Sequence, residues 1–162
     1  MVFFHDRFTH ADPELLARRT LQKRVDTKFI CRTRALDTLV APLEGHFHAA
    51  VSGRYVHAPY RTVYWDTPDR KSLFDHHRGK RPRFKVRIRH HIGRELSFLE
   101  VKSSRGQGNT SKNRFPLPYP CEDLAPEQLE EALTSHAFAP SHTLRPSMVI
   151  EFNRTTLVGV AM

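Results

Sequence analysis

A run of alternating basic and apolar residues constrains the fold of this chain more than any other feature. The run reads Lys85-Val86-Arg87-Ile88-Arg89. Successive side chains of a β-strand point to opposite faces, so a strand here carries three cations on one face. Same-face neighbours lie about 7 Å apart, and their like charges repel. Either water covers this face, or the face encloses an anion such as a phosphate chain, which arginine binds with paired hydrogen bonds and lysine as a point charge.

The pattern at 96–102 divides in the same way. Leu99 and Val101 take one face. The opposite face receives Phe98, Glu100 and Lys102. Gly93 separates this pattern from the preceding one, which predicts an antiparallel hairpin. Glu100 has two possible roles: it holds a neighbouring cation, or it ligates a divalent metal. The ion pair is favoured, because one carboxylate does not make a Mg²⁺ or Mn²⁺ site.

Three further segments place cations at alternate positions. They are Lys112 and Arg114 after a Gly- and Ser-rich stretch at 103–111, Arg24 and Lys28 around Asp26 in a pattern from Thr20 to Cys31, and Arg154 after Met148, Ile150 and Phe152. The stretch 103–111 is predicted to be a loop. Four strands with this alternation predict a basic-lined interior.

The whole sequence predicts an α+β fold built on an antiparallel sheet. Strand patterns cover 20–31, 60–66, 84–91, 96–102, 112–117 and 147–158. Helices are expected after Asp12, after a cap at Thr33 as far as Gly45, and from Pro126, with a helical turn or loop at 72–77. These elements do not repeat as strand–helix–strand units, which argues against a doubly wound fold.

The net charge points to an anionic partner. The 162 residues include 26 Lys and Arg against 17 Asp and Glu, a formal charge of +9. Nucleic acid, anionic membrane and other polyanions all fit such a balance. Nucleic acid is disfavoured, because single-strand binders stack bases on exposed aromatic residues. Phe29, Trp65, Phe98 and Phe152 lie in core-like or mixed patterns instead.

Several other classes of protein do not fit. No window approaches the roughly 18 apolar residues of a membrane span, and the N-terminus does not resemble a signal peptide, so we expect a cytoplasmic protein. Cys31 and Cys121 form no CxxC motif, and the 11 histidines form no HExxH motif, so a zinc site is not predicted.

Six short segments, in order across residues 20–158, resemble the vacuolar transporter chaperone (VTC) domain. This domain is the polyphosphate polymerase branch of the triphosphate tunnel metalloenzyme superfamily. The segments are Arg24-Val25-Asp26-Thr27-Lys28-Phe29, Tyr64-Trp65-Asp66-Thr67, Lys85-Val86-Arg87-Ile88-Arg89, Leu99-Glu100-Val101-Lys102, Lys112-Asn113-Arg114-Phe115 and Glu151-Phe152-Asn153-Arg154.

The resemblance implies an antiparallel barrel whose basic tunnel grips polyphosphate, tripolyphosphate or ATP. It implies transfer of the terminal phosphate of ATP to polyphosphate with Mn²⁺ or Mg²⁺. It also implies phosphate-binding roles for Lys28, Arg87, Arg89, Lys102, Lys112 and Arg154, to which the alternation adds Lys85 and Arg114. Arg87, Arg89 and Lys102 would stabilise charge on the transferring phosphoryl group.

The resemblance also sets the expected domain boundaries. Residues 1–19 are predicted to form an N-terminal helix or extension, and residues 20–162 the N-terminal part of a VTC domain. Family members continue beyond the strand that contains Arg154, with further tunnel strands and the main metal-ligating Glu. We therefore expect an incomplete barrel with an exposed strand edge. Phosphate binding should survive in it and turnover should not, and Glu100 is the candidate metal ligand.

Three alternatives remain open from the sequence. One is a triphosphate hydrolase of the same superfamily, which releases phosphate without lengthening a chain. The second is a non-catalytic module that binds RNA or DNA. The third is a misfolded remnant without function. The oligomeric state is not predicted.

Overall fold

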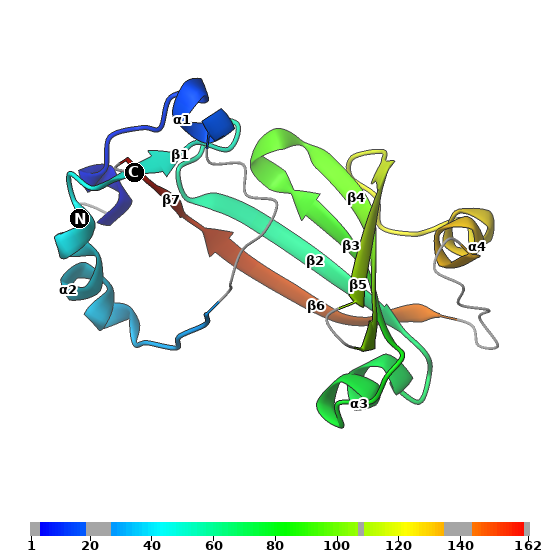
Figure 1. Ribbon diagram of the computed structural model, residues 1–162. Coiled ribbons are helices and arrows are strands. Elements are labelled where there is room, and N and C mark those ends of the chain that lie inside the picture. Colours follow the sequence, from blue (N-terminus) through cyan, green and yellow to red (C-terminus); the bar gives the residue numbers. More distant parts are fainter. Residues whose placement is uncertain (1–3, 19–26, 107–108, 135–143, 161–162) are drawn as a thin grey trace. The chain divides into compact units, whose positions relative to one another are not determined.

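The computed structural model describes residues 4–18, 27–106, 109–134 and 144–160 (Figure 1). The chain forms two compact units. Unit 1 comprises Met1–Ala58 and Asn153–Met162, and unit 2 comprises Pro59–Phe152. No described helix has the length and hydropathy to span a lipid bilayer.

Unit 1 consists of short helices and a two-stranded sheet. The helical elements are η1 (Phe4–Arg7), α1 (Pro13–Arg18), η2 (Thr33–Ala35), α2 (Leu36–Val40) and η3 (Ala41–Leu43). The strands β1 (Phe47–Ala50) and β7 (Thr156–Gly159) pair in antiparallel orientation. The predicted cap of α1 is confirmed, because the Leu15 N–H donates a 2.7 Å hydrogen bond to Asp12 Oδ1.

The helix predicted after Thr33 exists, but it is divided into three short pieces. Thr33 is the first residue of η2, and no side-chain hydrogen bond caps that element. Pro42 lies in the first turn of η3. Proline has no N–H to continue an α-helix, which explains why α2 ends where it does.

The strand predicted from Thr20 to Cys31 is wrong for its described part. Residues 27–32 have no regular secondary structure, and Phe29 and Ile30 are fully exposed. Alternation of side chains does not supply the partner strand that a β-strand requires. Arg24 and Asp26 lie outside the described residues.

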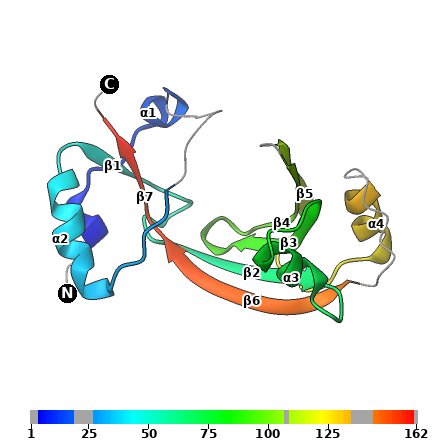
Figure 2. The same ribbon diagram turned by 60° about the horizontal axis from the view of Figure 1, so that its bottom comes forward.

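Unit 2 is built on a five-stranded sheet in the order β5-β4-β3-β2-β6. Its elements are β2 (Ala58–Asp66), α3 (Lys71–His77), β3 (Arg83–His91), η4 (Ile92–Arg94), β4 (Leu96–Gly106), β5 (Asn109–Leu117), α4 (Pro126–Thr134) and β6 (Arg145–Arg154). The β2–β3, β3–β4 and β4–β5 pairs are all antiparallel. The predicted α+β class is therefore confirmed. The sheet curves but does not close into a barrel among the described strands (Figure 2).

The strand boundaries differ from the sequence prediction in two places. The loop predicted at 103–111 is wrong, because β4 continues to Gly106 and β5 begins at Asn109. Ser103 pairs with Ser111 across the strands, and their hydroxyl oxygens lie 2.6 Å apart. Cross-strand pairing thus overrides the local turn preference of Ser and Gly. The strand predicted at 147–158 is divided into β6 and β7.

The apolar face of the sheet forms the core of unit 2. Its buried members are Val63, Trp65, Val86, Ile88, Leu99 and Val101, packed with Ala132 and Leu133 of α4. The apolar alternation predicted for β3 and β4 is therefore confirmed. Because α4 covers this face, the opposite face of the same strands is left for polar side chains.

Candidate functional site

The strand register gathers the predicted basic residues on one face of the sheet. Arg87 of β3 is paired with Glu100 of β4, which is paired with Arg114 of β5. The adjacent row places Lys85 opposite Lys102, and Lys102 opposite Lys112. We call the surface formed by these side chains the cationic face. Its six basic members are Lys85, Arg87, Arg89, Lys102, Lys112 and Arg114.

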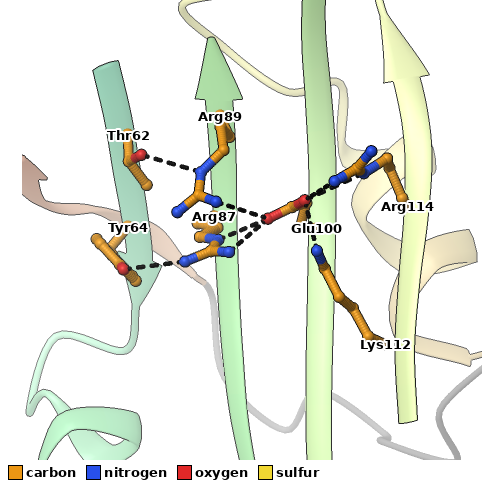
Figure 3. Close-up of polar contacts among 7 residues, drawn as sticks. All are labelled: Thr62, Tyr64, Arg87, Arg89, Glu100, Lys112 and Arg114. Atoms are coloured by element: carbon orange, nitrogen blue, oxygen red, sulfur yellow. Dashed lines mark hydrogen bonds and ion pairs between the residues drawn. The ribbon is translucent and has the colours of Figure 1, made fainter. Parts of the chain in front are cut away.

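Glu100 lies at the centre of the cationic face and is only 1% exposed (Figure 3). Its Oε2 accepts a 2.8 Å hydrogen bond from Arg87 Nε and lies 2.6 Å from Arg87 Nη2. Its Oε1 lies 2.9 Å from Arg114 Nη2 and 2.8 Å from Lys112 Nζ. Arg89 Nη1 is more distant, at 4.0 Å from Oε2. Both carboxylate oxygens are therefore occupied by cations from the two neighbouring strands.

The electrostatics of Glu100 follow from these contacts. Burial by itself raises the pKa of a carboxyl group, but hydrogen bonds from Lys112, Arg87 and Arg114 outweigh it and lower the pKa of Glu100 to about 2. The side chain is thus a carboxylate at neutral pH. It orients the guanidinium groups of Arg87 and Arg114 on the face.

Two neighbours from β2 support the arginines. Tyr64 Oη accepts a hydrogen bond from Arg87 Nη1 at 3.2 Å, and Thr62 Oγ1 lies 3.4 Å from Arg89 Nε. Sequence reasoning did not assign Thr62 and Tyr64 to the site. The sequence contained one signal for them: a spacing of two residues, which puts both side chains on the same face of their strand, in register with the basic strand.

One carboxylate does not balance six cations. No ion pair joins Lys85 or Lys102 to an acidic residue among the described part of the chain. Partial burial, then the positive charges of Lys102 and Arg83, lower the pKa of Lys85 despite an opposing effect of Tyr64. Burial and the charge of Arg87 likewise lower the pKa of Arg89. Like charges about 7 Å apart repel by about 2 kcal/mol at a surface dielectric constant, so a bound anion would stabilise this face.

The described residues do not fit a divalent cation at Glu100. Both carboxylate oxygens are held by Arg87, Lys112 and Arg114, which repel a metal ion. The part of the chain that the structure describes contains no cluster of three or more His, Cys, Asp or Glu side chains suited to metal binding. The geometry corresponds to the ion-pair role that the sequence favoured for Glu100.

Aromatic side chains lie beside the arginines at one end of the cationic face. We call Tyr60, His91, Phe98 and Phe152 the aromatic cluster. Tyr60 stacks on Phe152 with ring centroids 5.3 Å apart, and His91 meets the edge of Phe98 at 5.4 Å. The guanidinium of Arg89 lies 5.8 Å from the Phe152 ring centroid, and that of Arg114 lies 4.8 Å from the Phe98 centroid. Phe98 lies on the face of Glu100, as its alternation predicted, and Phe152, which the sequence placed in an apolar pattern, also lies next to a cation.

The motif Tyr64-Trp65-Asp66-Thr67 has a structural role at its acidic end. Asp66 accepts hydrogen bonds from the backbone N–H groups of Thr67, Ser72 and Leu73, at 2.8, 2.9 and 3.0 Å. The Thr67 hydroxyl accepts another from the Lys71 N–H. These bonds hold the first turn of α3 against the end of β2.

Two predicted phosphate-binding residues belong to unit 1. Lys28 is exposed in a segment without regular structure. Arg154 ends β6, and its Nε donates a 3.1 Å hydrogen bond to Thr156 Oγ1. No contact described in the structure joins either residue to the cationic face, so their phosphate-binding roles stay predictions.

Unit 2 therefore belongs to the class of antiparallel sheet domains that have one apolar face and one basic face. The family model of the VTC domain matches residues 23–161. The chain therefore belongs to the VTC domain family, as its six motifs predicted. A search of curated proteins finds no match. One similar solved structure is the crystal structure of a putative adenylate cyclase from Bacillus halodurans, with 12% identity and a TM-score of 0.46. That similarity covers 82% of this chain and 78% of the other.

Proposed function

We propose that unit 2 binds the phosphate chain of polyphosphate, tripolyphosphate or ATP on its cationic face. The observation that carries this proposal is the positive charge of Lys85 and Lys102, which no carboxylate among the described residues pairs, beside a Glu100 already held by Arg87, Lys112 and Arg114. A phosphate chain supplies several negative charges in a row, and the cations recur along β3 and β5 about 7 Å apart. Hydrogen bonds from ionised donors to phosphate oxygens are among the stronger ones in proteins.

We propose further that the domain is of the polyphosphate polymerase type. A terminal oxygen of polyphosphate attacks the γ-phosphorus of ATP, and the bond from that phosphorus to the bridging β–γ oxygen breaks. ADP leaves with the electron pair, and the polyphosphate is longer by one phosphate. In this proposal Arg87, Arg89 and Lys102 stabilise negative charge on the oxygens around the transferring phosphorus. Lys85, Lys112 and Arg114 hold the remainder of the chain.

A requirement for Mn²⁺ or Mg²⁺ stays a prediction of the resemblance. We assign no metal-dependent step to the described residues, because the cations around Glu100 occupy its carboxylate oxygens. Binding experiments with and without Mn²⁺ address this point separately from the role of the basic residues.

The test is calorimetric titration with tripolyphosphate at near-physiological salt, with and without Mn²⁺. We expect saturable binding near one site per chain. The double variant Lys85→Gln/Lys102→Gln removes two cations that are not bonded to Glu100, and we expect it to abolish this binding. The control Arg32→Gln/Arg34→Gln removes the same charge from exposed positions in unit 1 and should leave the affinity within about twofold.

Two results would overturn the proposed site. Weak, non-saturating binding that disappears with added salt would mean a generally basic surface. Equal losses in the two double variants would mean that net charge alone attracts the anion. The reaction type is tested by its product: a polymerase lengthens polyphosphate in the presence of ATP, whereas a hydrolase releases orthophosphate without lengthening a chain.

A further inference from the structure

Unit 2 contains a cavity that the phosphate-binding proposal does not use. It lies where β2, α3, β3 and β6 meet, and its volume is about 380 Å³. Among its lining residues are Trp65, Leu73, Lys85, Met148 and Ile150. Cavities of roughly 300–1,000 Å³ with a mainly apolar lining and a few polar groups are typical of small-molecule sites.

The apolar lining is unusually exposed for large side chains. Leu73 of α3 and Met148 and Ile150 of β6 are between 39% and 47% exposed. Single exposed apolar residues are common, but three that converge on one concave surface indicate an apolar occupant. Burial of these side chains by a flat ring would remove apolar area from water and so favour binding.

The polar side chains of the cavity lining indicate which charged or polar groups an occupant would carry. Lys85 lines the cavity and also belongs to the cationic face, so the two surfaces are continuous. Arg70 and His76 add basic side chains to the lining. The indole N–H of Trp65 is buried and has no hydrogen-bond partner among the described residues. A buried donor without a partner is unfavourable, but this one has no accessible surface in the cavity, so Trp65 contributes only the apolar part of its ring to the lining.

We propose that the cavity binds the nucleobase of a nucleoside triphosphate whose phosphate chain extends over Lys85 onto the cationic face. A nucleobase is a flat ring, which matches the apolar lining formed by Trp65, Leu73, Met148 and Ile150. The attached triphosphate matches the adjoining cations. This inference rests on the proposed function, because it names the part of ATP that lies beyond the phosphate site.

The aromatic cluster is the competing position for the base. It lies at the opposite end of the cationic face, next to Arg89 rather than Lys85. Its rings, however, already contact one another and the guanidinium groups of Arg89 and Arg114. The cavity is empty space beside the cations, whereas a base at the aromatic cluster would have to displace existing contacts. We therefore favour the cavity.

The experiment compares ATP with methyl triphosphate, which carries the same triphosphate without a nucleoside. Both are titrated calorimetrically into the full chain, and the fluorescence of Trp65, the single tryptophan, is recorded in parallel. We expect ATP to bind about tenfold more tightly, the order of one base contact with a protein side chain. We also expect ATP to change the Trp65 fluorescence more than methyl triphosphate does.

Two matched variants of β6 locate the base. Ser147→Phe adds a ring to a residue that lines the cavity, whereas Val149→Phe adds the same ring to an exposed residue outside the lining set. We expect Ser147→Phe to weaken ATP binding about tenfold and to leave methyl triphosphate within about twofold. Val149→Phe should change neither affinity.

The outcomes separate this inference from the proposed function. Equal affinities of the wild-type chain for ATP and methyl triphosphate would overturn the cavity inference and leave the phosphate site intact. A selective loss of ATP binding in Phe152→Leu, with no effect of Ser147→Phe, would place the base at the aromatic cluster and also overturn it. If neither triphosphate nor tripolyphosphate binds saturably, the proposed function itself fails.

Discussion

Replacing Glu100 by glutamine tests the electrostatic structure of the cationic face. The variant keeps the size of the side chain and removes its charge. In the folded protein the pKa of Glu100 lies at about 2 instead of 4.5. At about 1.4 kcal/mol per pKa unit, the difference corresponds to about 3 kcal/mol of stability at neutral pH. Because Glu100 is only 1% exposed, little of this is lost to solvent screening.

The pH dependence gives the sharper readout. A carboxyl group whose pKa is lowered by folding stabilises the protein above its unfolded pKa and loses that contribution as pH falls through the folded value. We therefore expect the free energy of unfolding of the wild-type chain to exceed that of Glu100→Gln by about 3 kcal/mol at pH 7. The difference should shrink between pH 4.5 and pH 2, because protonated Glu100 and glutamine are both neutral.

Urea unfolding followed by Trp65 fluorescence measures this difference. Trp65 is the single tryptophan and is buried in the core of unit 2, so it reports on the unit that contains Glu100. The control is Glu122→Gln, which removes an exposed carboxylate 2.9 Å from Arg61 and should cost less than about 1 kcal/mol. A Glu100→Gln difference that does not change with pH, or that is no larger than that of the control, would refute the reasoning.

Two further predictions follow from the same contacts. Glu100→Gln should bind tripolyphosphate more tightly than the wild-type chain, because the variant removes the acidic group from the cationic face. Calorimetry checks this affinity. A loss of Mn²⁺-dependent affinity instead would indicate that Glu100 ligates metal. Asp66→Ala should destabilise unit 2 by about 2 kcal/mol and speed hydrogen exchange at the Ser72 and Leu73 amides, because the carboxylate accepts hydrogen bonds from both. The exposed Asp123→Ala is its control, and unchanged exchange at Ser72 and Leu73 would contradict the assignment of Asp66 as the cap of α3.

The alternation of side chains was sufficient to predict the two faces of β3 and β4. Lys85, Arg87 and Arg89 share a face because the strand period is two, whatever the strand packs against. The hairpin around Gly93 followed from the same pattern. The segment around Lys28 carried a similar alternation, yet residues 27–32 form no strand. Local pattern does not supply a hydrogen-bonding partner, and this is why the prediction failed there.

The sequence was less informative about the neighbours of the basic residues. Phe152 follows Met148 and Ile150 in an apolar pattern that suggested a core, but strand order places it beside Arg89. The Ser- and Gly-rich stretch at 103–111 suggested a loop, although its ends continue β4 and β5. In both cases the deciding interaction is between strands, which local sequence preferences do not encode.

The sequence by itself determined the family, the antiparallel α+β class and the set of cations on alternate positions. These properties depend on residue identity and on the geometry of a single strand. Only the tertiary structure decided that Glu100 is saturated by Arg87, Lys112 and Arg114, and that a cavity adjoins Lys85. The charge state of a carboxylate, and whether its oxygens remain available to a ligand, depend on side chains from neighbouring strands. A cavity likewise depends on elements that are distant in sequence.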